Sequence, residues 1–314
     1  MQTTIGTDIS QAASLLKQNQ VVGIPTETVY GLAGNALSAE AIQKIYEAKN
    51  RPSFNPLIMH CHSLKQAKQY AVWNELAEIL YLNFCPGPLT FLLPKTPLVP
   101  QLLTAGSQQV AVRFPKHSMA RALLQQISFP LAAPSANPSG YISPVTAQQV
   151  QQHLAGKIPY VLDGGTCTEG LESTIVQVQG NSIEILRSGT ITLQQLAVYG
   201  EVSLVNGNAE KPATPGQLLS HYAPKTPLLV GNVAQLLEEH RSKNIAVLSL
   251  SSQFAGVYNH QLSPQGNLAE AAANVFNALH SLEAMQFDLI LVEPIPEEGI
   301  GIAIMDRLKR AQHQ

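Results

Sequence analysis

Charge and cysteine are both scarce in this chain of 314 residues. Only 13% of the residues are Asp, Glu, Lys or Arg, and the formal net charge is -2. A protein that coats nucleic acid needs a broad basic surface, so this composition argues against that class. Hydrophobic residues make up 45% of the chain, which is typical of a folded globular protein and excludes a disordered one. The composition is compatible with a small anion held by a few placed cations.

Secretion and membrane-spanning patterns are missing as well. Cys61, Cys85 and Cys167 are odd in number, and no two of them have the C-x-x-C spacing. We therefore expect reduced thiols in a cytoplasmic protein. The amino-terminal stretch has neither the basic nor the apolar region of a signal peptide, and no run of 18 apolar residues occurs. The sequence thus predicts neither a leader nor a membrane span.

The common nucleotide-binding and catalytic motifs are also lacking. The chain has neither G-x-x-x-x-G-K-[ST] nor a G-x-G-x-x-G after a strand. No Ser-His-Asp or Cys-His arrangement stands out, and we expect Cys85 to serve packing, not nucleophilic attack. His60 and His62 in "HCH" would share one face of a strand and could suit zinc. No second ligand cluster lies nearby in the sequence, so a zinc site is the less favoured interpretation.

Strands and helices alternate through residues 1–205, which predicts an α/β domain. Residues 8–20 and 38–50 have the spacing of amphipathic helices, with Pro52 ending the second. Short apolar runs predict strands at 21–25, 109–115 and 129–134. Residues 173–189 predict a hairpin that turns at Gly180 and Asn181.

A change of composition separates a second, smaller unit. Residues 206–227 are rich in Gly, Pro and Asn and are interpreted as a linker. Three short strands and two helical patterns in residues 228–314 then predict a small Rossmann-like α/β domain. It ends in the basic helix "AIMDRLKRAQ", whose charges we interpret as a solvated face.

Polar and basic residues recur where the predicted strands of the first domain end. Thr28, Ser135 and Ser173 follow strands, and Arg113 and Arg187 stand at strand ends. Any one of these could be an ordinary turn former or a solvated charge. Taken together they favour a crevice for an anionic, oxygen-rich ligand, because guanidinium groups match carboxylate and phosphate geometry.

Several long motifs then occur in a familiar order. They are "PTETVYGLAGNA", "IYEAKNRPSFNPLIMH", "PGPLTFLL", "VAVRFP", "APSANPSGYISPV", "GLESTIV", "LRSG" and "PGQLLSHYAPKTP". The chain resembles the threonylcarbamoyl-adenylate synthase family, in the long form with an extra carboxy-terminal domain. The resemblance implies an open, twisted, mixed-sheet fold with a large concave cleft, called YrdC-like. It also implies that L-threonine, bicarbonate or carbon dioxide, and ATP with Mg²⁺ give threonylcarbamoyl-AMP and pyrophosphate. A separate transferase would pass the threonylcarbamoyl group to tRNA.

The same resemblance assigns roles to individual residues. Lys49 and Arg51 would act on the phosphates and count as catalytic. The positions that match a threonine site are Thr28, His60, Arg113 and Ser173. The positions that match an ATP site are Lys49, Arg51, Asn55, Ser135, Ser143, Arg187 and Tyr222, with Tyr222 in a linker that would serve as a lid. No protein ligand for the metal is assigned.

The sequence departs from the family pattern at three positions. Cys85 stands where tryptophan is usual, which could loosen packing near the cleft. Gln109 replaces a threonine that often contacts ATP, and it is left out of the predicted site. Ser188 replaces a proline beside Arg187, which bears on the orientation of that arginine.

Two other functions are weighed against this one. A carbamoyl-adenylating enzyme of hydrogenase maturation has a related fold, but it carries zinc-finger regions whose cysteine spacing is absent here. An RNA-binding or ribosome-assembly module would use the cleft for RNA, and the net charge of -2 argues against it. We expect no strong direct binding to nucleic acid.

Overall fold

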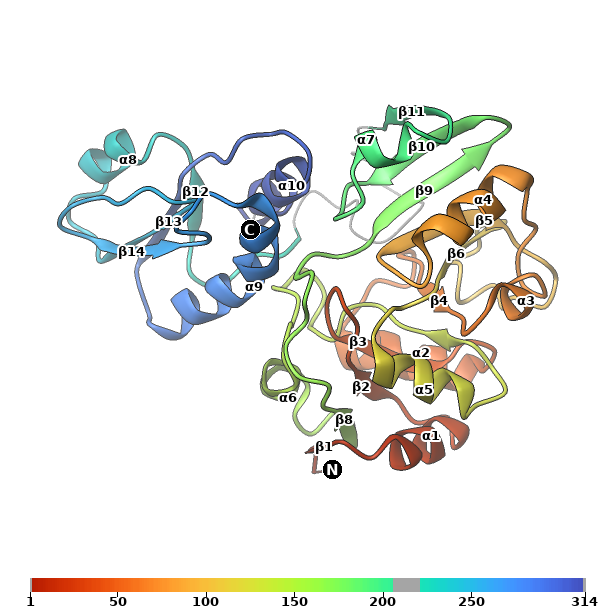
Figure 1. Cartoon of the computed structure of the whole chain (residues 1–314). Coiled ribbons are helices and arrows are strands. Elements are labelled where there is room, and N and C mark those ends of the chain that lie inside the picture. Colours follow the sequence, from red (N-terminus) through yellow and green to blue (C-terminus); the bar gives the residue numbers. More distant parts are fainter. Residues whose placement is uncertain (1, 206–220, 313–314) are drawn as a thin grey trace.

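The computed structural model describes residues 2–205 and 221–312, which form two separate β-sheets (Figure 1). The large sheet has the strand order β1-β8-β2-β3-β7-β4-β6-β5-β9-β10-β11 and mixes parallel with antiparallel pairs. Its strands are β1 (Thr4–Gly6), β2 (Val22–Ile24), β3 (Gly31–Asn35), β4 (Ile58–His60), β5 (Leu89–Pro94), β6 (Gln109–Arg113), β7 (Leu131–Ala132), β8 (Tyr160–Leu162), β9 (Thr174–Gln179), β10 (Ser182–Arg187) and β11 (Glu201–Leu204). The predicted hairpin is confirmed as β9 and β10.

Helices cover both faces of the large sheet, so its central strands are buried on both sides. Successive residues of β3 show this, because Leu32 belongs to the core on one face and Ala33 to the core on the other. Ile42 and Ile45 of α2 fill the first core, whereas α1 and α5 supply the second. The helices are α1 (Ile9–Lys17), α2 (Ala39–Lys49), α3 (Leu64–Ala67), α4 (Glu75–Phe84), α5 (Ser118–Gln125), α6 (Ala147–Leu154) and α7 (Leu193–Leu196).

Both predicted amino-terminal helices have a capping side chain at their first turn. The Asp8 carboxylate accepts hydrogen bonds from two backbone N–H groups of α1, and the Ser38 hydroxyl accepts one from Ala41 in α2. Asn50 ends α2 in the left-handed conformation, with φ of 50°. Asparagine tolerates that conformation, and it redirects the chain straight after the helix.

The small sheet is entirely parallel, with the order β12-β15-β13-β14. Its elements are β12 (Leu228–Val230), α8 (Val233–Glu239), β13 (Ile245–Ser249), β14 (Tyr258–Gln261), α9 (Leu268–Ala284), β15 (Leu289–Val292) and α10 (Gly301–Ala311). The three strands that the sequence predicts are β12, β13 and β15. The strand β14 was not predicted, because "YNHQ" is polar and half-exposed at the sheet edge and carries no apolar run.

The second domain contacts the first through α9 and α10, which lie on the side of the small sheet that faces the first domain (Figure 1). Gly170 sits so close to α9 that an added Cβ would come within 2.4 Å of the Ala273 carbonyl oxygen. Gln149 of α6 donates a hydrogen bond to Asn277 of α9 at 3.1 Å. The second domain is thus packed tightly against the first.

The prediction that the charges of the last helix form a solvated face is partly wrong. Lys309 of α10 is exposed, as expected, but Arg307 is only 1% exposed. The guanidinium of Arg307 is directed into the first domain, where it pairs with Glu172 at 3.0 Å. The basic residues of this helix therefore serve two different purposes.

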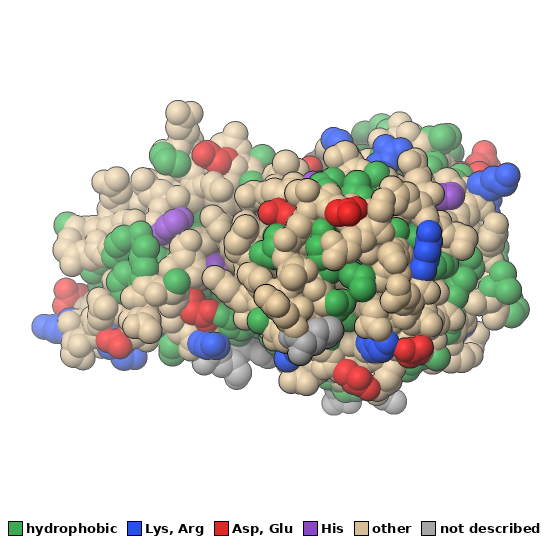
Figure 2. Space-filling view, turned by 90° about the horizontal axis from the view of Figure 1, so that it is seen from below, with side chains coloured by type: hydrophobic (Ala, Val, Ile, Leu, Met, Phe, Trp, Pro, Cys, Tyr) green, Lys and Arg blue, Asp and Glu red, His purple; other side chains and the backbone are tan. Residues whose placement is uncertain are grey.

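Most of the predicted linker, residues 206–220, lies outside the described residues, and the exact domain boundaries stay a prediction. Within 2–205 and 221–312, no helix is both long and apolar enough to cross a membrane. The face of the molecule in Figure 2 shows Lys and Arg side chains scattered among acidic and hydrophobic ones. It presents no broad basic patch on that side.

Candidate active site

A small buried cavity lies where β4 and β6 end side by side, with His60 aligned to Arg113 across the parallel pair. Its volume is about 40 Å³, room for no more than a few water molecules. The cavity is lined by Thr26, Val29, Gly31, Arg51, Ile58, His60, Arg113, Ala133, Pro134, Ser135, Glu172, Arg187, His221 and Tyr222.

Lys49 and Arg51 flank the left-handed turn at Asn50 and are both buried. Lys49 Nζ donates to the carbonyl oxygen of Ser135 at 2.6 Å and also to that of Asn137. Arg51 donates from Nη2 to Asn55 Oδ1 at 2.6 Å and to the Pro56 carbonyl oxygen at 2.9 Å. The turn therefore fixes two cations without any carboxylate partner among these contacts.

Burial and mutual repulsion act on the protonation of these two side chains. Burial is the main cause that holds the pKa of Lys49 well below its ordinary value, and the charge of Arg51 adds to it. Burial likewise lowers the pKa of Arg51 to about 10. A bound anion would reverse both effects, because an opposite charge nearby favours the protonated forms.

A second arginine, Arg113, enters the cavity from the end of β6. Its Nη2 donates to Glu27 Oε1 and to Thr28 Oγ1, each at 2.7 Å. Burial would raise the pKa of Glu27, but the Arg113 charge and the hydrogen bonds outweigh it and lower the pKa. Burial and then the Arg113 charge lower the pKa of His60 to about 3, so its imidazole is neutral at physiological pH.

A third arginine, Arg187, comes from the end of β10. Its Nη2 donates to Ser173 Oγ at 3.1 Å, and Nε and Nη2 both donate to the Ser173 carbonyl oxygen. Beside it, Glu172 accepts a hydrogen bond from Ser143 Oγ at 2.6 Å. The "LEST" segment thus supplies both an anchor for this arginine and a carboxylate to the cavity wall.

His221 and Tyr222 form the side of the cavity that comes from beyond the linker. Tyr222 has a φ of 66°, unusual for a residue with a side chain, and its ring packs 5.4 Å from that of Phe276. Burial raises the pKa of Tyr222 to about 12 and holds that of His221 well below its ordinary value. Both groups are therefore neutral at physiological pH.

Within the part of the chain that the structure describes, three buried polar atoms of lining residues have no hydrogen-bond partner: Arg113 Nε, His221 Nδ1 and Tyr222 Oη. A buried polar atom without a partner is costly and calls for an explanation. All three residues line one cavity, which indicates a place where a polar ligand would complete the hydrogen bonding.

The structure brings the sequence-predicted site residues to one place. Arg51, His60, Arg113, Ser135, Arg187 and Tyr222 line the cavity. The remaining predicted residues lie behind the wall, each hydrogen-bonded to a residue that lines it. These pairs are Lys49 with Ser135, Asn55 with Arg51, Thr28 with Arg113, Ser173 with Arg187, and Ser143 with Glu172. Their individual roles in binding stay predictions.

The site also contains residues that sequence reasoning missed. Glu172 and His221 line the cavity, and Glu27 holds Arg113 from behind. Glu27 and Glu172 belong to the motifs "PTETVYG" and "GLEST", where each directly precedes a predicted site residue with a hydroxyl group, Thr28 or Ser173. His221 directly precedes the predicted Tyr222. Proximity to predicted residues was the only indication that the sequence offered.

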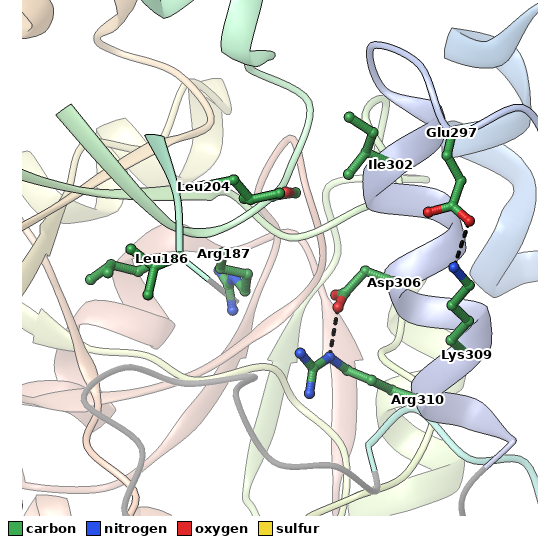
Figure 3. A pocket seen from close by; sticks show the side chains of 10 residues that line it. Leu186, Arg187, Leu204, Glu297, Ile302, Asp306, Lys309 and Arg310 are labelled. Atoms are coloured by element: carbon green, nitrogen blue, oxygen red, sulfur yellow. Dashed lines mark hydrogen bonds and ion pairs between the residues drawn. The ribbon is translucent and has the colours of Figure 1, made fainter. Parts of the chain in front are cut away.

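A second pocket, of about 230 Å³, lies between β10 and α10 and shares Arg187 with the first (Figure 3). Two ion pairs stand on its α10 side, Arg310 with Asp306 at 2.8 Å and Lys309 with Glu297 at 2.5 Å. Arg187 therefore lies at the boundary between the first cavity and the α10 face.

The structure bears on two positions where the sequence departs from the family pattern, Cys85 and Ser188, and on the zinc interpretation. Cys85 packs against the main core, and burial raises the pKa of its thiol to about 12, so it is no nucleophile at physiological pH. The Ser188 carbonyl oxygen accepts a hydrogen bond from Arg307 Nη2 at 2.8 Å. Within the described residues no group of three or more His, Cys, Asp and Glu could hold a metal ion, so the zinc interpretation of His60 and His62 finds no support.

Comparisons with known proteins agree along both domains. A family model described as "Telomere recombination" matches residues 14–189, and one described as "Threonylcarbamoyl-AMP synthase, C-terminal domain" matches residues 190–312. The threonylcarbamoyl-AMP synthase of Bacillus subtilis is 40% identical to this chain, and that of Pyrococcus abyssi is 38% identical. Each alignment covers 96% of this chain and 92% of the relative. The crystal structure of P. abyssi Sua5 complexed with L-threonine matches with a TM-score of 0.91 at 35% identity, over 99% of this chain and 96% of that one.

An open mixed sheet whose strand ends gather arginines, hydroxyls and a buried carboxylate around one cavity defines a YrdC-like enzyme. The predicted fold class is confirmed. The chain belongs to the threonylcarbamoyl-AMP synthase family, in the form that carries the C-terminal domain. Its members are ATP-using enzymes of the adenylyl-transfer type. These relatives carry the synthase name over nearly their whole length, so they support the synthase over the RNA-binding and carbamoyl-adenylating alternatives.

Proposed function

We propose that the chain condenses L-threonine, bicarbonate or carbon dioxide, and ATP into threonylcarbamoyl-AMP and pyrophosphate. The observation that carries the proposal is the convergence of Arg51, Arg113 and Arg187 on one cavity. One guanidinium group suits the carboxylate of an amino acid, and the others suit the phosphates of a nucleotide. The P. abyssi relative crystallised with L-threonine supports the amino-acid half of this assignment.

The threonine end of the site is assigned to Arg113 and its neighbours. Arg113 is oriented by Glu27 and Thr28, which hold its Nη2, so the unpartnered Nε is kept at a fixed position as one of its further donors. The neutral His60 imidazole beside it can exchange a hydrogen bond with the threonine hydroxyl. Threonine and not valine would then be selected, because a site built to hydrogen-bond a hydroxyl rejects an analogue without one.

The phosphate end is assigned to Lys49, Arg51 and Arg187. Carbon dioxide adds to the neutral amine of threonine, and the amine loses a proton to solvent to give the carbamate. A carbamate oxygen then attacks the α-phosphorus, and the bond from that phosphorus to the bridging oxygen breaks, so that pyrophosphate leaves. Charge moves onto the leaving pyrophosphate, where guanidinium and ammonium groups stabilise it. Correct orientation of the two reactants contributes on the order of 7–11 kcal/mol, so the mechanism needs no protein nucleophile.

Mg²⁺ enters this scheme as part of the ATP substrate. The buried carboxylates at the cavity, Glu27 and Glu172, are already paired with Arg113 and Arg307. Among the described residues there is accordingly no carboxylate set that fits a resident metal ion. We assign no step to a protein-bound metal.

The lining by His221 and Tyr222 bears on how ATP would enter. Nucleotide pockets typically measure hundreds of Å³, whereas this cavity measures about 40 Å³. His221 and Tyr222 would therefore have to move outward for ATP to bind and could then close against it. This is the lid role that we propose for the described end of the linker.

The direct test is incorporation of labelled bicarbonate into threonylcarbamoyl-AMP, measured with pyrophosphate release. We expect product only when L-threonine and ATP are both supplied, and no product with L-valine in place of threonine. ATP turnover that is independent of threonine would contradict the proposal. Handover of the product to a tRNA threonylcarbamoyl transferase and a cytoplasmic location are part of the same proposal.

A further inference from the structure

Arg307 of α10 is the second domain's charged contribution to the edge of the active site. Its side chain is fully buried, and its Nε donates to Glu172 Oε2 at 3.0 Å. The other two nitrogens donate to Asp306 Oδ2 at 2.7 Å and to the Ser188 carbonyl oxygen at 2.8 Å. Every nitrogen of this guanidinium is engaged, so the group is held in one orientation.

Glu172 is the carboxylate whose charge Arg307 balances, and it lines the cavity together with Arg187. Its other oxygen accepts the bond from Ser143 Oγ. Burial alone would raise the pKa of Glu172, but Arg307 and Arg187 outweigh it and lower the pKa, so the carboxylate is ionised. An ionised carboxylate beside Arg187 competes with any phosphate for that arginine.

Loss of the Arg307 charge would affect Glu172 more than Asp306, the other carboxylate that Arg307 contacts. Asp306 also has Arg310 as a partner at 2.8 Å, so it would stay paired without Arg307. Among the described residues, Glu172 would keep the hydrogen bond from the Ser143 hydroxyl and the nearby charge of Arg187. In a buried, weakly screened site an unpaired carboxylate is strongly attracted to the nearest guanidinium.

We propose that Arg307 is a positioning residue for nucleotide binding, because it pairs with Glu172 from the second domain and thereby keeps that carboxylate from competing with phosphate for Arg187. The inference rests on the proposed function, in which ATP occupies this cavity. Arg307 also contacts the cavity through Tyr222, because its guanidinium carbon lies 5.4 Å from the centre of that ring, within the range of a cation–π interaction. The second domain would thus set the phosphate affinity of the first.

The test is a charge-rescue experiment on the full chain. Arg307→Met removes the charge at similar length, and we expect the KM for ATP to rise at least tenfold while the KM for threonine changes less than threefold. Adding Glu172→Gln removes the competing carboxylate, so the double variant should recover most of the ATP affinity. Arg307→Lys keeps the charge and should stay within threefold of the wild type.

Arg241→Met is the matched control, because it removes an exposed arginine of the same domain. The Arg241 side chain is 80% exposed, and that of its partner Glu238 is 76% exposed. We expect it to behave as the wild type. Equal rises in both KM values, or a double variant as impaired as Arg307→Met, would overturn the inference. If Arg307→Met does not fold, the double variant and Arg307→Lys decide, since neither leaves Glu172 charged and unpaired. A wild type without threonine-dependent activity would instead refute the proposed function.

Discussion

The ammonium of Lys49 lies 2.6 Å from the backbone carbonyl oxygen of Ser135, in a position that is 1% exposed. A lysine this deeply buried is held by backbone oxygens alone among its described hydrogen bonds, with no carboxylate among them. Such an arrangement disfavours the charged form until an anion arrives, so it is suited to binding phosphate and costs the empty protein stability.

Removing either cation of the turn should abolish the chemistry. We expect Lys49→Met and Arg51→Met each to lower threonine-dependent pyrophosphate release at least a hundredfold, because each loses one charge that stabilises the leaving group. Lys44→Met is the control on the same helix, since Lys44 pairs with Glu40 in a half-exposed position. Near-normal turnover in either test variant, with folding verified by circular dichroism, would exclude the phosphate role.

Tyr222 should matter more for the nucleotide than for the amino acid. Tyr222→Ala removes a buried ring, and calorimetry should show a larger loss of ATP affinity than of threonine affinity. Tyr222→Phe keeps the ring and removes only the hydroxyl, which has no hydrogen-bond partner among residues 2–205 and 221–312, so it should give a smaller loss. An unchanged ATP affinity in Tyr222→Ala would rule out contact between this ring and the nucleotide.

The Arg113–Glu27 pair should make stability depend on acid pH. The folded pKa of Glu27 lies below its ordinary value of 4.5, so its contribution is complete above that pH and is lost as the pH falls through the folded pKa. Glu27→Gln should cost about 3 kcal/mol of unfolding free energy at pH 7 and flatten the acid limb. Urea unfolding between pH 2 and 7 measures both, with the exposed Glu297→Gln as control. Parallel pH curves for Glu27→Gln and wild type would contradict the assignment.

Gly170 should be essential for docking of the second domain. It has a φ of 69°, and a Cβ would meet carbonyl oxygens of Ala272 and Ala273 at 2.5 and 2.4 Å. Gly165 has a similar φ of 81°, but a Cβ there would meet nothing within 4 Å. Gly165→Ala therefore carries only the backbone strain of about 1–2 kcal/mol, and Gly170→Ala adds the clash. We expect Gly170→Ala to lower both Tm and ATP affinity further than Gly165→Ala, and equal effects would argue against a tight domain contact there.

Local features of the fold were predictable because they depend on short sequence patterns. Ser38, the apolar spacing of α2 and Pro52 define one helix, and Gly180 with Asn181 defines the β9–β10 turn. β14 was not predictable, since an edge strand needs no apolar run. The strand order, in which β7 with only two residues stands between β3 and β4, depends on long-range packing that no local pattern encodes.

The cationic residues of the site were predictable because charge is scarce and stands at strand ends. The pairing of those charges was not. Nothing in the sequence distinguishes Arg307 from its basic neighbours in α10, yet it alone of the three is fully buried. Its partner Glu172 comes from a different domain, and only the packing of α9 and α10 against the first sheet brings them together.

The distance of 135 positions between Glu172 and Arg307 has a consequence for biosynthesis. At translation speeds of about 5–20 residues per second, the ribosome makes the arginine roughly 7–27 s after the glutamate. During that interval a nascent first domain must keep this carboxylate hydrated or protonated, and its cleft can assume the mature charge distribution only after α10 has emerged.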